Sequence, residues 1–454
     1  MSSQPELGPL AFWVASNAPQ NFDSALRERL YATILDWSSA LIAGTNHSLF
    51  PSYLKGLSRL GEVGPVHIAG ASGTYPLAVG ASVNAAISHL WEVDDAHRTS
   101  TSHPGITIIP AVMAIAESRN ISTERFAGAI VAGFEVVLRI GSHLGPDHYA
   151  RCHTTATAGT FGAAAAIAHA IELNEADTLS AFGHAGTQAA GLWQFLDDKT
   201  IDAKAFHAAT AVRNGISAAL MAEAGIAGAP HILEGPRGMR AAWGLKGCDP
   251  SWLLPTAKPM IHDVTIKGWP VCGQMHSALD CARAIANDYS APLTDIEHVL
   301  VELPRSALEI AGAREPTNVS HAKFSTSFCI AAVLSKNSPD FRGLRQSLVD
   351  NQKIAELAER VHVLEEPSFT ARFPNERPAR VTLYPKNGPP IIEERAFRGG
   401  DPEAPWSRPQ LRQRTLDILT LSDGSWDAEA LFSWCLSFSN IEAEWQASKL
   451  FSLT

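Results

Sequence analysis

Four polar stretches of the sequence contain most of the side chains that could carry acid–base chemistry or bind anions. In the first, residues 88–117, an acidic cluster that includes Asp94 and Asp95 precedes His103-Pro104-Gly105. Proline and glycine fix a tight turn before the apolar segment that follows. His103 is therefore expected at the start of a helix, where functional side chains often gather. For the two aspartates, the pattern fits a functional role and helix capping equally well.

The other three stretches contribute further histidines, a cysteine and two lysines. Their candidate residues are His153, Lys204, His207, Lys267, Cys272 and His276. Taken singly, each has an ordinary structural explanation, such as a residue before a helix, a surface lysine or a buried thiol. Taken together with His103, the lysines and histidines form a set of cations suited to a small polycarboxylate.

The sequence lacks the usual local motifs of cofactor and hydrolase chemistry. It contains no GxGxxG, GxxxxGK[ST], HExxH or GxSxG segment. Cys272 and His276 are four residues apart and could share one helix face, but zinc requires three or four ligands. We therefore predict no metal and no cofactor. A nucleophilic Cys272, activated by Lys267 and His276, is the alternative to a buried, inert thiol.

Composition predicts a soluble protein with a large core. The chain has 454 residues, 46% of them hydrophobic, and 36 Lys and Arg against 46 Asp and Glu give a net charge of −10. A chain this acidic, without a basic block, argues against nucleic acid as a partner. The six scattered cysteines indicate reduced thiols, the N-terminus lacks a secretory pattern, and apolar runs such as 128–140 are too short for a membrane span. We expect a cytoplasmic protein.

The pattern of elements changes near residue 265. Before it, small and apolar residues predict helices and no strand, and after it β-branched alternation predicts strands among helices, with a turn at Asn387-Gly388. The expected helices span 24–44, 80–90, 109–119, 124–142, 159–171, 205–224, 276–289, 322–336, 408–421 and 427–450. The expected strands span 296–303, 361–364, 381–384 and 391–394.

Several segments, in this order along the chain, resemble the MmgE/PrpD family. They read EVDDAH followed by HPG, HTTATAGTFGAAAA, AGTQAAGLW, DAKAFHAATAVRNG, GAPHILEGPRG, KGWPVCGQMH and AKFS. Each is weakly specific alone, but the ordered set spans most of residues 30–330 and is specific. The C-terminal third matches in pattern only. The family includes 2-methylcitrate dehydratase, cis-aconitate decarboxylase and iminodisuccinate epimerase.

The resemblance implies a mainly α fold. One large all-helical domain would be formed by both chain ends, residues 1–265 and 396–454, and residues 266–395 would form a smaller inserted α+β lid. It also implies a homodimer without a cofactor, with the active site between the two domains. Carried over residue by residue, that site comprises Asp94, His103, His153, Lys204, Lys267 and His276, and the same motifs add Asp95, His207 and Cys272 as substrate-binding candidates.

Two segments depart from the family pattern. Where the family often has D-F-D-D-T, this chain has Glu92-Val93-Asp94-Asp95-Ala96. Where the family often has W-H-P, this chain has Cys152-His153-Thr154. The spacing of Lys204 and His207 looks more like the decarboxylase and epimerase branches than the methylcitrate dehydratase branch. These departures leave the identity of the substrate open.

We therefore expect a lyase, either a dehydratase or a decarboxylase, that acts on a small di- or tricarboxylate. In this hypothesis Lys204 and Lys267 bind substrate carboxylates, and His103, oriented by Asp94, transfers protons. His153 would act as the opposing acid or as a donor to a carboxylate. Two alternatives stay open: an isomerase or epimerase of a substituted succinate in the same pocket, and a non-catalytic carboxylate-binding protein.

Overall fold

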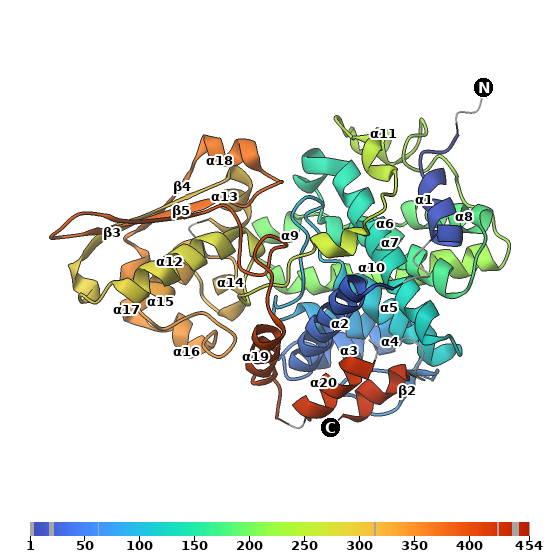
Figure 1. Cartoon of the computed structure of the whole chain (residues 1–454), viewed down its shortest axis with the longest axis horizontal. Helices are drawn as coiled ribbons and strands as arrows, with labels where there is room; N and C mark the ends of the chain where they lie inside the picture. The colour runs from blue at the N-terminus through green and yellow to red at the C-terminus, as the bar shows by residue number, and fades with distance from the viewer. Residues whose placement is uncertain are drawn as a thin grey trace.

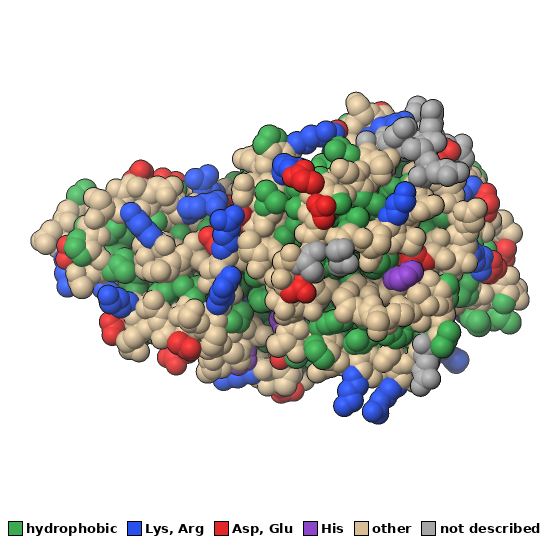
Figure 2. Space-filling model, turned by 90° about the horizontal axis from the view of Figure 1, so that it is seen from below, with side chains coloured by type: hydrophobic (Ala, Val, Ile, Leu, Met, Phe, Trp, Pro, Cys, Tyr) green, Lys and Arg blue, Asp and Glu red, His purple; other side chains and the backbone are tan. Residues whose placement is uncertain are grey.

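The chain folds into a mainly helical structure with one four-stranded sheet (Figure 1). The computed structural model describes residues 4–17, 22–61, 63–312, 315–424, 426–437 and 445–453. Helices gather in the larger body, and the sheet with its covering helices forms the smaller body at the left of Figure 1. On the face seen in Figure 2, basic and acidic side chains are interspersed with hydrophobic ones.

The larger body begins with eleven helices among the described residues. They are α1 Gly8–Phe12, α2 Ser24–Gly44, α3 Phe50–Ser58, α4 Leu77–His89, α5 Gly105–Ser118, α6 Thr123–Tyr149, α7 Thr154–Ala170, α8 Glu175–Gly186, α9 Gln194–Asp197, α10 Lys204–Glu223 and α11 Met239–Trp243. Every helix predicted before residue 265 is present, with ends that differ by up to seven residues. For α2 both ends agree with the prediction, and Asp23 caps its start by accepting a hydrogen bond from the Leu26 N–H (2.8 Å).

Small residues let the central helices approach closely. The helix α7 is buried along its whole length between α6 and α10. A Cβ added at Gly162 would lie 2.7 Å from Cβ of Val137 on α6 and 3.0 Å from the carbonyl oxygen of Gly133. Gly159 and Gly162 therefore serve helix packing.

We expect Gly162→Ala to destabilise the protein. The added methyl group has no free space, so it should lower the free energy of unfolding by about 1–3 kcal/mol, as overpacked cores do. Denaturant titration of the purified variant measures this change. Gly56→Ala is the matched control, because a Cβ at Gly56 on α3 meets nothing within 4 Å. That control should be neutral or slightly stabilising, and equal losses in both variants would contradict the packing argument.

The smaller body is built on a mixed sheet with strand order β4-β3-β5-β6. Its strands are β3 Ile296–Leu303, β4 Val361–Glu365, β5 Ala379–Pro385 and β6 Ile391–Arg395. β3 pairs in parallel with β4 and antiparallel with β5, and β5 and β6 form the hairpin predicted from Asn387-Gly388. The helices of this part are α12 His276–Asp288, α13 Arg305–Ala311, α14 Val319–Ala322, α15 Thr326–Leu334, α16 Gln346–Val349, α17 Gln352–Ala358 and α18 Pro367–Arg372.

The chain then returns to the larger body through α19 Arg408–Leu419 and α20 Ala428–Ser437. α19 packs against α2, and Leu411, Leu431 and Leu450 belong to the same hydrophobic cluster as the first helices. A second cluster contains residues of 269–383 alone. On this ground we propose the division into 1–265 with 396–454 and an inserted 266–395.

Three expectations about elements were wrong. A two-stranded ribbon, β1 Val66–His67 with β2 Thr74–Tyr75, lies in the part expected to be helical only. The helix expected over 322–336 is broken at Lys323–Ser325, because the Ser325 side chain caps α15 as a separate helix. Of the helix expected over 427–450, α20 ends at Ser437, a 3₁₀ helix spans Ala447–Ser452, and 438–444 lie outside the described residues.

One helix of the described chain is long and apolar enough to cross a membrane, judged by length and composition. This helix is α6, and every residue of its apolar window is buried inside the protein. Such burial on all sides is typical of a central core helix.

Candidate active site

The candidate site surrounds the loop that joins α4 to α5. His89 ends α4, and the loop that follows it carries Asp94 and reaches His103 just before α5. The backbones of Ala96 and Thr265 pair in an isolated bridge, which places the start of the loop beside the segment that carries Lys267. Residues far apart in the sequence therefore meet here.

His103 is held in one tautomer. Its Nδ1 donates to the carbonyl oxygen of Asp95 (2.7 Å) and lies 3.1 Å from Oδ2 of Asp94. Because both neighbours are acceptors, Nδ1 must carry the proton, and Nε2 keeps its lone pair. Burial lowers the pKa of His103 to about 4, with the charge of Lys267 adding to the effect and Asp94 opposing it. His103 is thus a neutral base at pH 7, and its side chain is 14% exposed.

Asp94 orients a second histidine as well. Its Oδ1 accepts from Nδ1 of His89 (3.0 Å), and Nε2 of His89 lies 3.7 Å from Oε1 of Glu92. Burial opposes ionisation of Asp94, but His89 and Lys267 outweigh it and hold the pKa of Asp94 well below its usual range. The ring centroids of His89 and His103 lie 4.9 Å apart. One buried carboxylate therefore positions two imidazoles side by side.

His153 completes a cluster of three imidazoles at the start of α7. Its ring lies 5.9 Å from that of His103 and 6.1 Å from that of His89. Nδ1 of His153 is 3.2 Å from Nδ1 of His207, so one of these nitrogens donates to the other. Burial holds the pKa of His153 well below its usual range, which leaves it neutral.

Glu92 binds both lysines that the sequence singled out. Its Oε1 accepts from Nζ of Lys204 (2.5 Å), and its Oε2 and carbonyl oxygen accept from Nζ of Lys267 (3.3 and 3.1 Å). Burial opposes ionisation of Glu92, but the two lysines outweigh it and keep its pKa well below its usual range. Lys267 is fully buried, which would lower its pKa, yet Asp94 and Glu92 raise it above its usual value. The result is a charged triad inside the protein.

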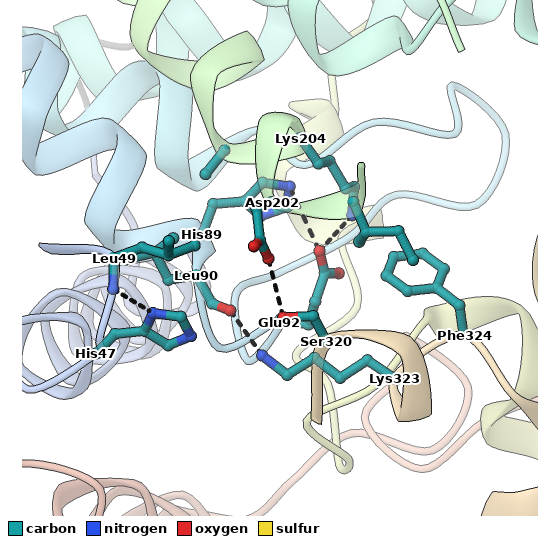
Figure 3. A pocket seen from close by; sticks show the side chains of 12 residues that line it. His47, Leu49, His89, Leu90, Glu92, Asp202, Lys204, Ser320, Lys323 and Phe324 are labelled. Atoms are coloured by element: carbon teal, nitrogen blue, oxygen red, sulfur yellow. Dashed lines mark hydrogen bonds and ion pairs between the residues drawn. The ribbon is translucent and has the colours of Figure 1, made fainter. Parts of the chain in front are cut away.

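Glu92 and Lys204 of the triad border a pocket, which we term the inner pocket (Figure 3). The free space inside it is about 20 Å³, room for about one water molecule. It is lined by His47, Leu49, His89, Leu90, Glu92, Ile201, Asp202, Lys204, Ala205, Ser320, Lys323 and Phe324. The pocket thus lies where the α14–α15 segment meets the first helices.

Of the nine predicted site residues, only Lys204 lines the inner pocket. Five others belong to the adjoining cluster of imidazoles and charges: Asp94, His103, His153, His207 and Lys267. The remaining three have structural contacts instead. Asp95 accepts the N–H of Gly105 (2.9 and 3.1 Å) and so caps α5. His276 is fully buried at the start of α12 and donates from Nε2 to the carbonyl oxygen of Val271 (3.0 Å). Burial raises the pKa of the Cys272 thiol, so it stays protonated at neutral pH and does not show the activation that a nucleophile needs.

Arg414, from α19, fixes the backbone on both sides of the site. It donates to the carbonyl oxygens of Val93 and Lys267 (2.6 Å each) and pairs with Asp36 (2.7 Å). Val93 precedes Asp94 directly, so one buried guanidinium holds the two chain segments that carry the charged residues. The C-terminal part of the chain is therefore needed for the geometry of the site.

The imidazole cluster also has donors that could hold a metal ion. Ring nitrogens of His89, His103 and His153 lie within 4.8 Å of one another, and so do ligand atoms of His89, Glu92 and Asp94. Imidazole nitrogens with a carboxylate, here Asp94, beside two of the rings are typical of transition-metal sites. The ammonium groups of Lys204 and Lys267, bound to Glu92, oppose a divalent cation at the same place.

We expect the fold to lose stability in mild acid, because it buries several histidines in the neutral form. Burial lowers the pKa of His97 to about 3 and those of His103 and His148 to about 4. The unfolded chain binds protons below about pH 6.5, whereas these folded sites do not until near pH 4. The melting temperature should therefore fall as the pH drops from about 6.5 towards 4. A flat profile over that interval would contradict the assignment, and His148→Gln should reduce the slope.

The sequence analysis did not select four residues of this region as site residues: His89, Glu92, Lys323 and Arg414. Glu92 stood in the acidic cluster and Lys323 in the AKFS segment, so a signal existed for both. His89 ends an apolar helix, where a histidine looks like an ordinary helix-end residue. Nothing in the local sequence of Arg414 marks it, because its partners are far away along the chain.

Two family models match the two main parts of the chain. Residues 8–249 match the MmgE/PrpD N-terminal domain, and residues 269–436 match the MmgE/PrpD C-terminal domain. The chain belongs to the MmgE/PrpD family. The second match runs past residue 395, where we place the end of the inserted part.

Curated relatives are similar over part of their length. A cis-aconitate decarboxylase-like protein oryM of Aspergillus oryzae is 28% identical over 234 residues, which is 50% of this chain and 48% of the relative. The cis-aconitate decarboxylase of Homo sapiens is 23% identical over 66% of this chain and 63% of the relative. That of Mus musculus is 24% identical over 68% and 64%. The chain thus spans about half to just under two thirds of these relatives.

Proposed function

We propose that this protein is a lyase that removes CO₂ or water from a small di- or tricarboxylate by acid–base chemistry. The observation that carries the proposal is the fixed tautomer of His103, whose Nδ1 is bound by the Asp95 carbonyl oxygen while Nε2 keeps a free lone pair. The names of the relatives, cis-aconitate decarboxylases, favour loss of CO₂ over loss of water.

The site offers the two things that such chemistry needs beside a carboxylate. A proton must move to or from a carbon atom, and the negative charge that develops must be stabilised. His103 supplies the base in the empty site, and a bound polyanion would raise its pKa so that it can also return a proton as an acid. Lys204 and Lys267 supply positive charge, which Glu92 holds in place until a substrate carboxylate competes for it.

A substrate screen tests the proposal. The purified protein is incubated in D₂O with cis-aconitate, methylcitrate, citrate and substituted succinates, with and without EDTA, and products are followed by proton NMR. We expect loss of CO₂ or water from at least one of them. The EDTA arm shows whether a metal ion bound by the histidine cluster takes part.

The same screen separates the alternatives. Deuterium incorporation without loss of a group would indicate an isomerase or epimerase, since a neutral base can remove and return a proton at one carbon. Binding of a polycarboxylate without any exchange or turnover would indicate a carboxylate-binding protein. Either result would overturn the lyase proposal.

A further inference from the structure

Lys323 lies in the break between α14 and α15, and its side chain crosses to the end of α4. It is 2% exposed, and its Nζ donates to the carbonyl oxygen of Leu90 (2.7 Å) (Figure 3). The same Nζ lies 4.9 Å from the centre of the Trp91 ring. Both partners are uncharged. A carbonyl group and an aromatic ring stabilise an ammonium group only in part, so Lys323 lacks a full counter-charge.

The other lysines of the region are different. Lys204 and Lys267 share the carboxylate of Glu92, whereas among the described residues no carboxylate oxygen lies within 4.0 Å of Nζ of Lys323. Burial lowers the pKa of Lys323 to about 8, and the more distant charges of Glu92 and Asp202, which exceed those of Lys204 and Lys267 in effect, offset this only in part. A buried ammonium group in this state gains from an anion placed beside it.

We propose that Lys323 forms a carboxylate subsite in the inner pocket and binds one carboxylate of the di- or tricarboxylate substrate. This inference rests on the proposed function, because it takes a polycarboxylate as the occupant. Ser320 lines the same pocket, and its hydroxyl group donates to Asp202 (2.9 Å). The subsite adds a cation from the α14–α15 segment to Lys204, which the helical body supplies.

A larger cavity lies beside the inner pocket. This cavity, which we term the outer cavity, shares Ile201 and Phe324 with the inner pocket. These two side chains therefore separate the cavities. Nζ of Lys204 lies 5.4 Å from the centre of the Phe324 ring, so a substrate that passes Phe324 meets Lys204 and Lys323 together.

Binding of tricarballylate, a stable tricarboxylate, tests the subsite by isothermal titration calorimetry. Lys323→Met removes the charge and keeps the apolar stem, and we expect affinity to fall about 10- to 100-fold, as for loss of a charge-assisted hydrogen bond. Lys323→Arg should recover most of the affinity. Lys353→Met is the matched control, because Lys353 is exposed on α17 and lines neither cavity, and this variant should bind tricarballylate as tightly as the unmodified protein.

Proton uptake gives a second readout that needs no variant. The groups that face Lys323 are Glu92, Lys204, Asp202 and His47, and burial lowers the pKa of His47 to about 3. Above about pH 8 part of Lys323 is uncharged, so binding of a carboxylate should draw a proton onto it. Calorimetric titrations in two buffers of different ionisation enthalpy measure the protons taken up on binding. We expect proton uptake at about pH 8.5, less uptake at pH 7, and none with the Lys323→Met variant.

The outcomes separate the two proposals. If Lys323→Met folds and binds as tightly as the unmodified protein, or if the unmodified protein binds no tricarballylate or takes up no proton, the subsite is wrong. The lyase proposal stands in each case if the screen finds turnover. If binding depends on Lys323 but no substrate is turned over, the subsite stands and the lyase proposal fails.

Discussion

Replacing His103 by asparagine should lower kcat about 10²- to 10⁴-fold for whichever substrate the screen identifies, and should leave KM nearly unchanged. The reason is the geometry of its two ring nitrogens. Nδ1 is occupied by the Asp95 carbonyl oxygen, so only Nε2 can exchange a proton with a substrate. Asparagine keeps a polar side chain there but cannot take up the proton. Steady-state kinetics measure the two parameters separately.

The pH profile makes this prediction sharper. Because the pKa of His103 in the empty site is about 4, the base form is present throughout the neutral range. kcat/KM should therefore stay level from pH 7 down to about pH 5 rather than fall through 6.5. His184→Asn, a change on α8 outside the imidazole cluster, should keep full activity. If the variant at position 103 raises KM and leaves kcat unchanged, His103 binds the substrate and does not transfer a proton in the reaction.

Replacing Glu92 by glutamine should lower the free energy of unfolding at pH 7 by about 3–5 kcal/mol, the usual cost of removing one partner of a buried ion pair. Glutamine has the shape of glutamate, so packing is preserved while Lys204 and Lys267 both lose their shared counter-charge. Denaturant titration measures the loss. Glu403→Gln is the matched control, since its pair with Arg98 is partly exposed and should contribute at most about 1 kcal/mol.

The effect of Glu92→Gln should depend on pH in a defined direction. The folded-state pKa of Glu92 lies well below its unfolded value, so its stabilising contribution is complete above about pH 4.5 and is lost as the pH falls through the folded value. The difference between the two proteins should accordingly be constant near neutrality and shrink in acid. If the two proteins differ in free energy of unfolding by less than about 1 kcal/mol at pH 7, the ion pairs of Glu92 with Lys204 and Lys267 do not stabilise the fold as proposed.

Local signals in the sequence were sufficient for most elements. Helix α2 and strand β3 have the predicted bounds because a capping aspartate and strict alternation act over a few residues. The ribbon of β1 and β2 was missed because two residues per strand are too few to show alternation. Ser325 before an apolar run was a capping signal that would have separated α15 from α14.

The residues of the site were easier to predict than their pairings. Histidines and lysines stand out in short motifs, so His103, His153, Lys204 and Lys267 could be chosen from sequence. Their connection through Glu92 could not, because that residue lies 112 positions from Lys204 and 175 from Lys267. The sequence also could not show that Lys323 lacks an adjacent carboxylate, because only the folded structure determines which groups lie beside it.

The contact of Arg414 with Val93 and Lys267 has a consequence for the time course of synthesis. The residues with acid–base chemistry leave the ribosome first, but the guanidinium that fixes their backbone follows Lys267 by 147 residues. At about 5–20 residues per second, that delay is roughly 7–30 s. During this interval the nascent chain carries Asp94 and Lys267 without the group that joins their segments. A ribosome-bound chain stalled before Arg414 should therefore be inactive and sensitive to protease, and one released after Leu450 has been added should be neither.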